Sequence, residues 1–324
     1  MAPKPGRFAV IEAIQQEMQR DQNLSLWWWI RPTAVSPFGK VIDLHREFGQ
    51  DRVPQYTPID EEWFVGAAAG AAMSGVPCIA NPGYMCMTRA FDLVFNQIGK
   101  LRHMTGGQAS MPFVLWQDGA GRTPGMAGQH SDAGQEALFA GLPGVKVVVP
   151  SNPHDAKGLM IAAIRDPDPV IFYHYGAINR VRIDVPDDAY AIKIGEANIV
   201  QEGTDITIVG IGPSMLDVNE AAKTLKADGV NAEIIDIRSI KPMPAAQIAA
   251  SVRKTGKLLV VDHGHETMGT SAEIIARAAI DVPGAKFARI AFPDAPPPGN
   301  REMIAWMTPD ATRTVDAAKK MVAS

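Results

Sequence analysis

The sequence predicts an α/β protein of two domains, each built on a doubly wound parallel sheet. Its 324 residues exceed the ~100–200 residues of an ordinary domain, which favours two domains. Short β-rich runs alternate with helical patterns along the chain, as in parallel sheets covered by helices. Residues 184–195 are polar, proline-bearing and without periodicity, which is typical of a linker. We therefore expect domains at residues 1–185 and 186–324.

The first domain is predicted to open with an amphipathic helix. Val10, Ile14 and Met18 recur every four residues within residues 7–20, so they lie on one helical face. Strands are expected where short apolar, β-rich runs occur, at residues 78–80, 112–116, 145–149 and 169–173. Because helical stretches separate these runs, we expect the strands to pair in parallel.

The second domain repeats this alternation. Strands are expected at residues 206–209, 232–237, 257–261 and 286–290, and helices at 214–228, 243–253 and 271–280. The proline-rich residues 291–300 predict a rigid loop. A closing helix is expected to begin at Thr308 and Pro309, as an N-cap followed by proline at the first helical position.

The composition excludes several classes of function. A net charge of −4 and the lack of any lysine or arginine run argue against nucleic acid or an anionic membrane as a partner. No stretch reaches the ~18 apolar residues of a membrane span. The first residues lack the apolar core of a signal peptide, so we expect a cytoplasmic protein. Cys78 and Cys86 have no CxxC spacing, so we expect free thiols and no metal site formed by cysteines.

A carboxylate stands at the head of an alanine- and glycine-rich helix in residues 56–75. Small residues let another backbone or a cofactor approach such a helix closely. The pattern alone favours a simpler interpretation, in which Glu61 is one of three acids, with Asp60 and Glu62, that the helix dipole favours at its N-terminus. A cofactor-binding role for Glu61 is the alternative.

A glycine-rich loop in residues 118–158 contains His130. Histidine is suited to proton transfer near neutral pH, and a flexible loop can present it at the mouth of a site. Isolated loop histidines are usually solvated, so the pattern alone favours that interpretation of His130 over a catalytic one.

Together, these segments resemble the beta subunits of 2-oxo acid dehydrogenases, a family with pyruvate, branched-chain and acetoin members. The resemblance lies in TPIDE at 57–61, FVGAAAGAAMSG at 64–75, AFDLVFNQIGKLRHMTGGQ at 90–108 and LPGVKVVVPSNPHDAKG at 142–158. It continues in TDITIVGIG at 204–212, AEIIDIRSIKPM at 232–243 and VRKTGKLLVVDHGHETMGTSAEI at 252–274. It implies a transketolase-like pyrimidine-binding domain followed by a transketolase C-terminal-like domain.

The resemblance also implies site residues. The family's acid in the place of Glu61 hydrogen-bonds the aminopyrimidine ring of thiamine diphosphate, and sharing that proton works best where water is excluded. The family's histidine in the place of His130 lies near the reacting substrate and handles protons or charge. An aromatic ring packs on the aminopyrimidine in the family; here Cys86 occupies that position and Tyr84 lies two residues before it.

The chain departs from the family at Trp28-Trp29-Ile30, where an acid pair is usual. Three consecutive tryptophans, Trp27 to Trp29, cannot all face one core, so at least one is expected at a domain or subunit surface. The alternative is that one or two of Trp27, Trp28 and Trp29 wall the substrate pocket, which implies a bulky or apolar acyl group, with Trp28 also beside the cofactor. His174 replaces a common glutamate, and we expect a buried histidine with its hydrogen bonds satisfied.

A partner chain is implied as well. The family binds diphosphate through Mg²⁺ with a GDG motif and a following asparagine, and DGAGR at residues 118–122 does not substitute for it. That motif belongs to a separate alpha subunit, so an α2β2 heterotetramer is expected, in which the alpha subunit holds most of the diphosphate and the Mg²⁺.

The leading hypothesis is half of an enzyme. With its alpha subunit it would cleave a 2-oxo acid or related ketone and pass the acyl group on, in dehydrogenases to a lipoyl group on an acyltransferase. A non-catalytic partner subunit is the alternative, because the acid pair is lost. A nicotinamide site at Gly210-Ile211-Gly212 is disfavoured, because Met215 stands where a third glycine is required.

Overall fold

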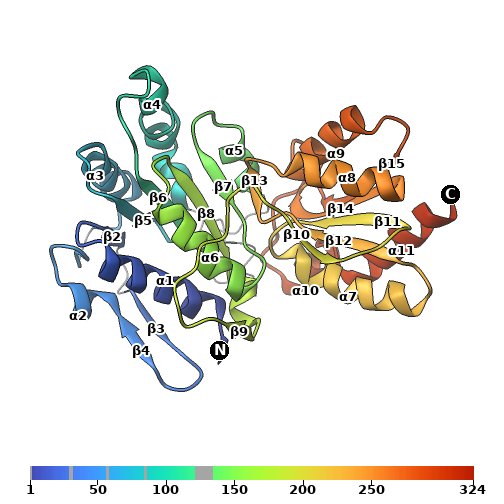
Figure 1. Cartoon of the computed structure of the whole chain (residues 1–324), viewed down its shortest axis with the longest axis horizontal. Coiled ribbons are helices and arrows are strands. Elements are labelled where there is room, and N and C mark those ends of the chain that lie inside the picture. Colours follow the sequence, from blue (N-terminus) through green and yellow to red (C-terminus); the bar gives the residue numbers. More distant parts are fainter. Residues whose placement is uncertain (1, 29–31, 56–57, 84–85, 121–133) are drawn as a thin grey trace. The chain divides into compact units, whose positions relative to one another are not determined.

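The computed structural model describes the chain except residues 1, 29–31, 56–57, 84–85 and 121–133 (Figure 1). The described residues form two compact units. Unit 1 comprises residues 2–120 and 139–194, and unit 2 comprises residues 134–138 and 195–324. The change of unit after residue 194 lies in the predicted linker, while the domain limit at residue 185 stays a prediction.

Unit 1 contributes five parallel strands to one sheet, in the order β7, β8, β6, β5, β2. The strands are β2 (Ser25–Trp28), β5 (Cys78–Asn81), β6 (Phe113–Ala120), β7 (Lys146–Val148) and β8 (Val170–Tyr175). The four strands predicted in this half are confirmed. β2 was not predicted, because its tryptophans hide the period-two pattern of a strand.

Helices cover both faces of the unit 1 sheet. α1 (Gly6–Arg20) and α6 (Pro153–Ile164) lie side by side on one face (Figure 1), which confirms the helix predicted at residues 7–20. α3 (Glu61–Met73) covers the other. Successive residues of a strand point to opposite faces. Accordingly, Trp28 packs in the core with residues of α1, and Trp27 packs against Trp63 of α3.

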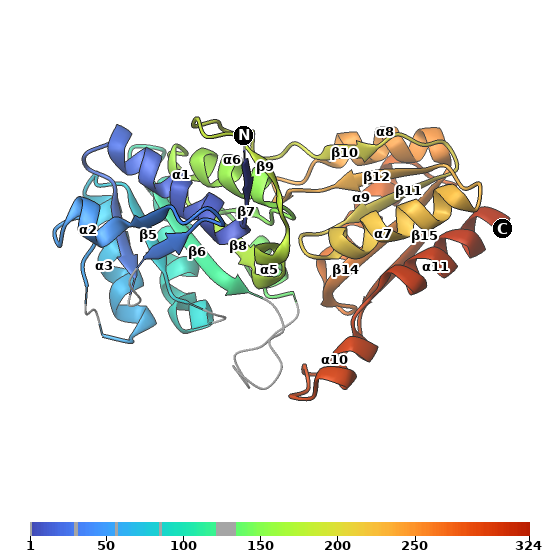
Figure 2. The same ribbon diagram turned by 90° about the horizontal axis from the view of Figure 1, so that it is seen from below.

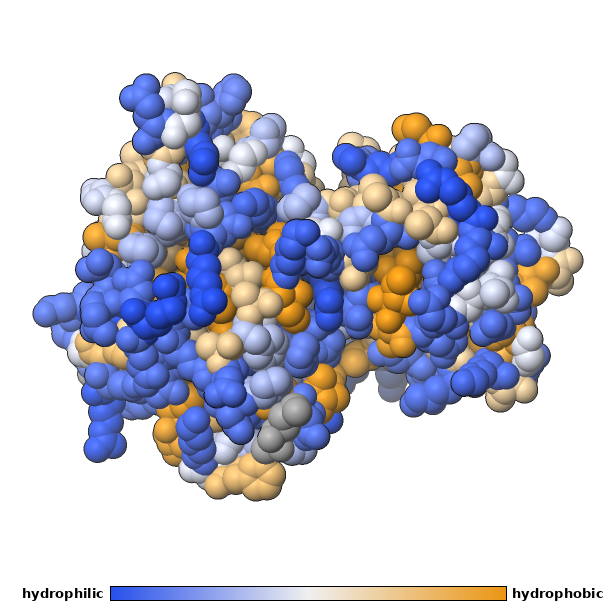
Figure 3. Space-filling model, in the orientation of Figure 1, coloured by the Kyte–Doolittle hydropathy of each residue, from blue (hydrophilic) through white to orange (hydrophobic). Residues whose placement is uncertain are grey.

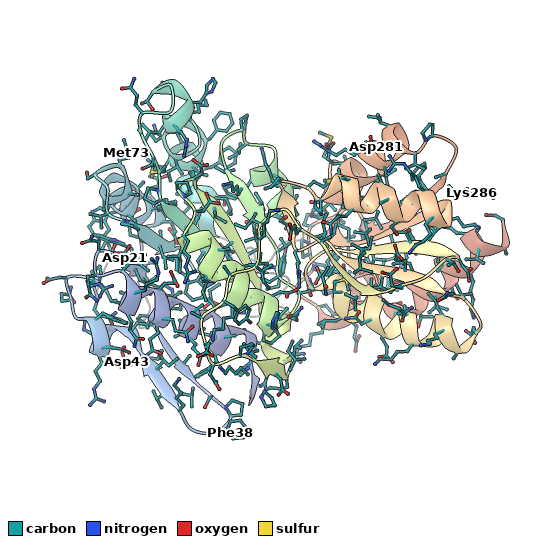
Figure 4. The ribbon with its side chains drawn as sticks, viewed as in Figure 1. Asp21, Phe38, Asp43, Met73, Asp281 and Lys286 are labelled. Carbon is teal, nitrogen blue, oxygen red and sulfur yellow. The ribbon has the colours of Figure 1, made fainter. Side chains whose placement is uncertain are left out.

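The remaining elements near unit 1 are short. β1 pairs with β9, and β3 pairs with β4 as a hairpin, both antiparallel. Figure 4 shows Phe38 in the turn of this hairpin and Asp43 at the start of α2, where the Asp43 carboxylate accepts a hydrogen bond from the Arg46 backbone N–H. The elements are β1 (Ala2–Lys4), β3 (Thr33–Val35), β4 (Val41–Asp43), α2 (Leu44–Phe48), η1 (Cys86–Ala90), η2 (Leu93–Ile98), α4 (Leu101–Met104), α5 (Glu136–Ala140), η4 (Gly176–Arg180) and β9 (Ile183–Val185).

Unit 2 contains a sheet in the order β10, β12, β11, β14, β15. β11, β12, β14 and β15 are parallel and confirm the four predicted strands. β10 runs antiparallel at one edge, a pairing that the sequence pattern did not predict. The strands are β10 (Asn198–Gln201), β11 (Ile206–Gly210), β12 (Ala232–Asp236), β14 (Lys257–His265) and β15 (Lys286–Phe292), with the short β13 (Ser239–Lys241) between β12 and β14 in the chain.

Two pairs of helices cover the unit 2 sheet (Figure 2). α7 (Ser214–Ala227) packs against α11 (Ala311–Ala323), and α8 (Ala245–Thr255) packs against α9 (Thr270–Asp281). The three helices predicted between residues 214 and 280 are confirmed. The predicted start of the last helix was wrong: α11 begins after Asp310, whose carboxylate accepts from the Arg313 N–H. Thr308 instead ends α10 (Arg301–Met307), which the sequence pattern did not predict.

The surface is largely hydrophilic on the face shown in Figure 3, with separate apolar patches between charged side chains. Each unit has its own core: one between the sheet and α1 and α6, the other between the sheet and α7 and α11. Within the described ranges, each helix is too short or too polar to span a bilayer.

Candidate active site

The carboxyl ends of β2, β5, β6 and β8 form one edge of the unit 1 sheet. Open α/β sheets bind ligands at this edge. Trp28 is level with Asn81, and Asp118 is level with His174 in the strand register. Each of these side chains is less than a tenth exposed, so the edge gathers buried polar groups from four strands.

Glu61 is the first residue of α3, and it is only 6% exposed. The residue before it, Asp60, caps the helix by accepting a hydrogen bond from the Trp63 backbone N–H. Among the described residues, the ion pair of the Glu61 carboxylate is with Arg89, whose Nε lies 3.4 Å from Oε2 and whose side chain is 65% exposed. Because Asp60 performs the capping, the Glu61 carboxylate remains available for a ligand.

The surface of α3 after Glu61 allows close approach. A Cβ atom added at Gly70 would meet no atom within 4 Å, and one added at Gly66 would touch only the Leu93 side chain, at 3.4 Å. η1, which follows β5 and carries Arg89, packs against α3. The glycine face of α3 is therefore free of close contacts at Gly70, as small residues allow, and approach of a cofactor there stays a prediction.

Four predicted site residues cannot be placed by their side chains. Tyr84, Trp29 and His130 lie outside the described residues. Cys86 begins η1, but its side chain also lies outside the described part. The contacts predicted for these residues with cofactor or substrate stay predictions.

Trp28 is 1% exposed and packs in the unit 1 core. Its ring centroid lies 5.1 Å from that of Trp116 at an interplanar angle of 60°, and the Arg7 guanidinium carbon lies 5.1 Å from the Trp28 ring. Trp27 is half-buried, and its indole N–H donates to the Ser25 hydroxyl. Core packing thus explains the position of Trp28, and its predicted role beside cofactor or substrate stays a prediction.

A buried network that the sequence did not predict surrounds His174. Its Nδ1 lies 3.1 Å from Asp118 Oδ1, and its Nε2 lies 3.0 Å from Asn179 Oδ1. Arg7 closes the ring, because its backbone N–H donates to Asn179 Oδ1 and its Nη1 lies 3.2 Å from Asp118 Oδ2. Burial would raise the pKa of Asp118, but His174 and Arg7 hold that pKa below its usual value. His174 is buried as predicted, and its Nε2 is hydrogen-bonded to Asn179, but among the described residues its Nδ1 makes only the contact with Asp118 and no hydrogen bond; the prediction is therefore confirmed only in part.

Side chains of unit 2 fill the turn after β11. A Cβ atom at Gly210 would lie 2.3 Å from the Met215 sulfur, so Met215 packs directly on that glycine. The Ser214 hydroxyl accepts from the Ile211 N–H and donates to the Val261 carbonyl. These contacts support the interpretation of this segment as a strand-to-loop turn.

Both halves of the chain match known protein families. A family model described as "Transketolase, pyrimidine binding domain" matches residues 5–180, and "Transketolase, C-terminal domain" matches residues 195–313. A solved structure described as "Split gene transketolase, inactive beta4 tetramer" superposes with a TM-score of 0.81 at 20% identity, covering 99% of this chain and 98% of that one, which supports the fold.

Two curated relatives are similar over nearly their full length. The "Acetoin:2,6-dichlorophenolindophenol oxidoreductase subunit beta" of Cupriavidus necator is 38% identical, covering 97% of this chain and 96% of the relative. The "Pyruvate dehydrogenase E1 component subunit beta" of Bacillus subtilis is 33% identical, covering 97% of each. The chain therefore belongs to the transketolase-like family of beta subunits that includes those of pyruvate dehydrogenase E1 and acetoin:2,6-dichlorophenolindophenol oxidoreductase.

Proposed function

We propose that the chain is the beta subunit of a thiamine diphosphate-dependent oxidoreductase that acts, with an alpha subunit, on a 2-oxo acid or a related ketone. The carrying observation is the buried Glu61 carboxylate at the head of α3, within the matched pyrimidine-binding domain. The relatives' names support the substrate class, because one is a pyruvate dehydrogenase component and the other an acetoin oxidoreductase. Both are named as beta subunits, which supports a separate partner chain.

The residues around Glu61 fit an aminopyrimidine ring. The carboxylate is buried, and among the described residues its ion pair is the long one from Oε2 to the exposed Arg89, so Oε1 could exchange a proton with a ring nitrogen. When bound, thiamine diphosphate would supply a nucleophilic carbon for the substrate carbonyl and a ring that takes up the electron pair when the adjacent substrate bond breaks. Glu61 would orient the ring and hold the shared proton, and its burial would strengthen that hydrogen bond by limiting competition from water.

Partner chains would supply the diphosphate and metal site and the acyl acceptor. We place the diphosphate and Mg²⁺ mainly on an alpha subunit carrying a GDG motif and asparagine, because DGAGR at residues 118–122 lacks that pattern. We place the assembly, as an α2β2 heterotetramer, in the cytoplasm. The acyl group would pass to a lipoyl group on an acyltransferase. On this chain, His130 would handle protons beside the substrate, and Tyr84 or Cys86 would contact the cofactor ring.

Reconstitution tests this function. The chain is copurified with a GDG-bearing alpha chain and assayed with pyruvate, branched-chain 2-oxo acids and acetoin, using dichlorophenolindophenol as electron acceptor. Dye reduction that requires both chains, thiamine diphosphate and Mg²⁺ is the expected result. An assembled complex that binds the cofactor and turns over none of these substrates would instead identify a non-catalytic partner subunit.

A further inference from the structure

In the part of the chain that the structure describes, three buried N–H groups at the carboxyl edge of the unit 1 sheet have no hydrogen-bond partner. They are Nε1 of Trp28, Nδ2 of Asn81 and Nε1 of Trp116, all on residues no more than 1% exposed. Trp28 pairs in register with Asn81, and Trp116 directly follows Leu115, the partner of Ala80. The three residues therefore lie level on adjacent strands. Buried donors without acceptors are rare in native proteins and indicate a missing partner.

These donors share one face of the sheet. Residues level on neighbouring strands project to the same side, and the Trp28 and Trp116 rings touch with centroids 5.1 Å apart. Asn81 lies between them in strand order. Its Oδ1 accepts a hydrogen bond from the Gly83 N–H at 2.8 Å, which identifies the other amide atom as the donor.

Positive charge lies beside this row. The Arg7 guanidinium carbon is 5.1 Å from the Trp28 ring, and at 39% exposed the Arg7 side chain connects the buried donors with solvent. Arg7 stands in the first turn of α1, whose N-cap residue, Pro5, offers no side-chain hydrogen bond. The partial positive charge of the helix N-terminus therefore adds to that of the guanidinium.

Among the described residues, the oxygen acceptors beside this row already face other groups, and His174 Nδ1 is a ring nitrogen without a hydrogen-bond partner. The Asp118 carboxylate lies against His174 and Arg7. Asn179 Oδ1 accepts from the Arg7 backbone N–H and faces His174 Nε2. The cluster consequently holds more buried donors than acceptors, and the group that would complete it must supply acceptor atoms.

We infer that Arg7, Trp28, Asn81 and Trp116, the donor cluster, form a binding site for a small carboxylate. A carboxylate has acceptor atoms only, so it suits indole and amide N–H donors and pairs with a guanidinium. The burial of the three donors restricts the ligand to a few heavy atoms. The Trp28 and Trp116 rings pack on the face covered by α1, and α3, which begins with Glu61, covers the other face, so a carboxylate site there goes beyond the proposed function.

Titration of the full chain, without cofactor or partner, tests the site. Acetate, pyruvate and acetone serve as probes, followed by tryptophan fluorescence and isothermal titration calorimetry. Acetate and pyruvate are expected to bind with equal stoichiometry and acetone, which has similar size but no charge, to give no signal. Tighter binding of pyruvate than of acetate would show that the site also recognises the 2-oxo group, and equal binding would show a plain carboxylate site.

Substitutions in the donor cluster test whether the carboxylate binds there. Arg7→Met is expected to weaken the Kd for acetate about tenfold, and Trp28→Phe or Trp116→Phe, which keep an aromatic ring and remove one N–H, about threefold each. Arg46→Met, at an exposed arginine of α2, is the matched control and should leave the Kd unchanged. Glu61→Gln should also leave it unchanged, so failure of the site and failure of the proposed function are distinguishable.

Three results would overturn the site. They are no carboxylate binding by the unmodified chain at tens of millimolar, acetone binding as tight as that of acetate, or the same Kd for Arg7→Met as for Arg46→Met. If Arg7→Met fails to fold, as judged by its thermal transition, those tryptophan variants that keep the thermal transition of the unmodified chain decide the question, because phenylalanine retains an aromatic ring in the core and lacks the N–H.

Discussion

The two units share a parallel sheet covered by helices, but their buried polar groups at the strand ends have different partners. In unit 2, Asp262 near the carboxyl end of β14 accepts hydrogen bonds from the Gly264 and Ser271 backbone N–H groups. In unit 1, the N–H donors of Trp28 and Asn81 at the carboxyl edge of the sheet have no partner among the described residues. The Thr270 and Ser271 hydroxyls of unit 2 also lack a partner there. Unit 2 thus uses the Asp262 carboxylate to fix its own turn, whereas the unpaired donors of unit 1 are those that we assign to a ligand.

Buried charge also differs between the units. In unit 1, Glu12 Oε2 lies 2.6 Å from the Lys4 ammonium and 3.0 Å from that of Lys157, and each of these side chains is at most 5% exposed. In unit 2, the buried Glu233 pairs with Lys254, which is 40% exposed. Removing Glu12 therefore leaves the fully buried Lys157 without its ion pair, although Lys4 keeps one with Asp187, whereas Lys254 can turn to water.

The largest effect on stability is expected from Glu12→Ala. It leaves the buried Lys157 ammonium with backbone carbonyls as its hydrogen-bond partners among the described residues, while Lys4 keeps its ion pair with Asp187, so the free energy of unfolding of unit 1 should fall by about 3–5 kcal/mol. Urea unfolding followed by tryptophan fluorescence measures it, because five of the six tryptophans precede residue 120. Glu220→Ala, at an exposed glutamate paired with Lys223, is the control and should not move the midpoint. Equal urea midpoints for the two variants would show that the buried ion pairs of Glu12 do not contribute to the free energy of unfolding.

A smaller effect, confined to unit 2, is expected from Asp262→Ala. Two charge-assisted hydrogen bonds to backbone are lost, which costs roughly 2–3 kcal/mol. Differential scanning calorimetry should show the transition of unit 2 at a lower temperature and that of unit 1 unchanged. Asp316→Ala, at an exposed residue of α11, should shift neither transition. A shift of the unit 1 transition by Asp262→Ala would contradict the separate roles assigned to the two sets of polar groups.

The smallest effect is expected from pH. Burial would raise the pKa of Glu12 and of Asp118, but Lys4 and Lys157 lower the former, and His174 and Arg7 lower the latter, below their usual values. Both carboxylates therefore stabilise unit 1 fully above their unfolded pKa, about 4, and this contribution is lost as the pH falls through the lower folded pKa.

Urea midpoints measured between pH 7 and pH 3 check this expectation. The midpoint of unit 1 should fall below about pH 4, and Glu12→Gln should flatten that fall because the variant has no carboxylate to protonate. A urea midpoint of unit 1 that rises on acidification would contradict this expectation.

Much of the fold was predictable because apolar runs and their spacing are local properties of the chain. β2 was missed because its tryptophans pack on both faces, and β10 because an antiparallel edge strand carries no signal of direction. The start of α11 was placed too early because Thr308-Pro309 has the form of a cap, while Asp310 performs the capping.

The site was predictable only in part. The pattern around Glu61 favoured an acid at a helix end, and the family resemblance pointed to the cofactor; in the structure Asp60 performs the capping. The contacts of Trp28 with Trp116 and of Arg7 with Asp118 could not be predicted, because they depend on the register of strands and helices far apart in the sequence.

The most direct test compares Glu61→Gln with Glu62→Gln in the assembled complex. The two residues are neighbours at the start of α3, but Glu61 is buried and Glu62 is exposed. Glu61→Gln is expected to lower kcat with pyruvate or acetoin at least ~100-fold, because glutamine keeps the shape and cannot exchange the proton. Glu62→Gln should retain full turnover, and both complexes should assemble and melt alike. Equal turnover of the two variants would contradict the role of Glu61.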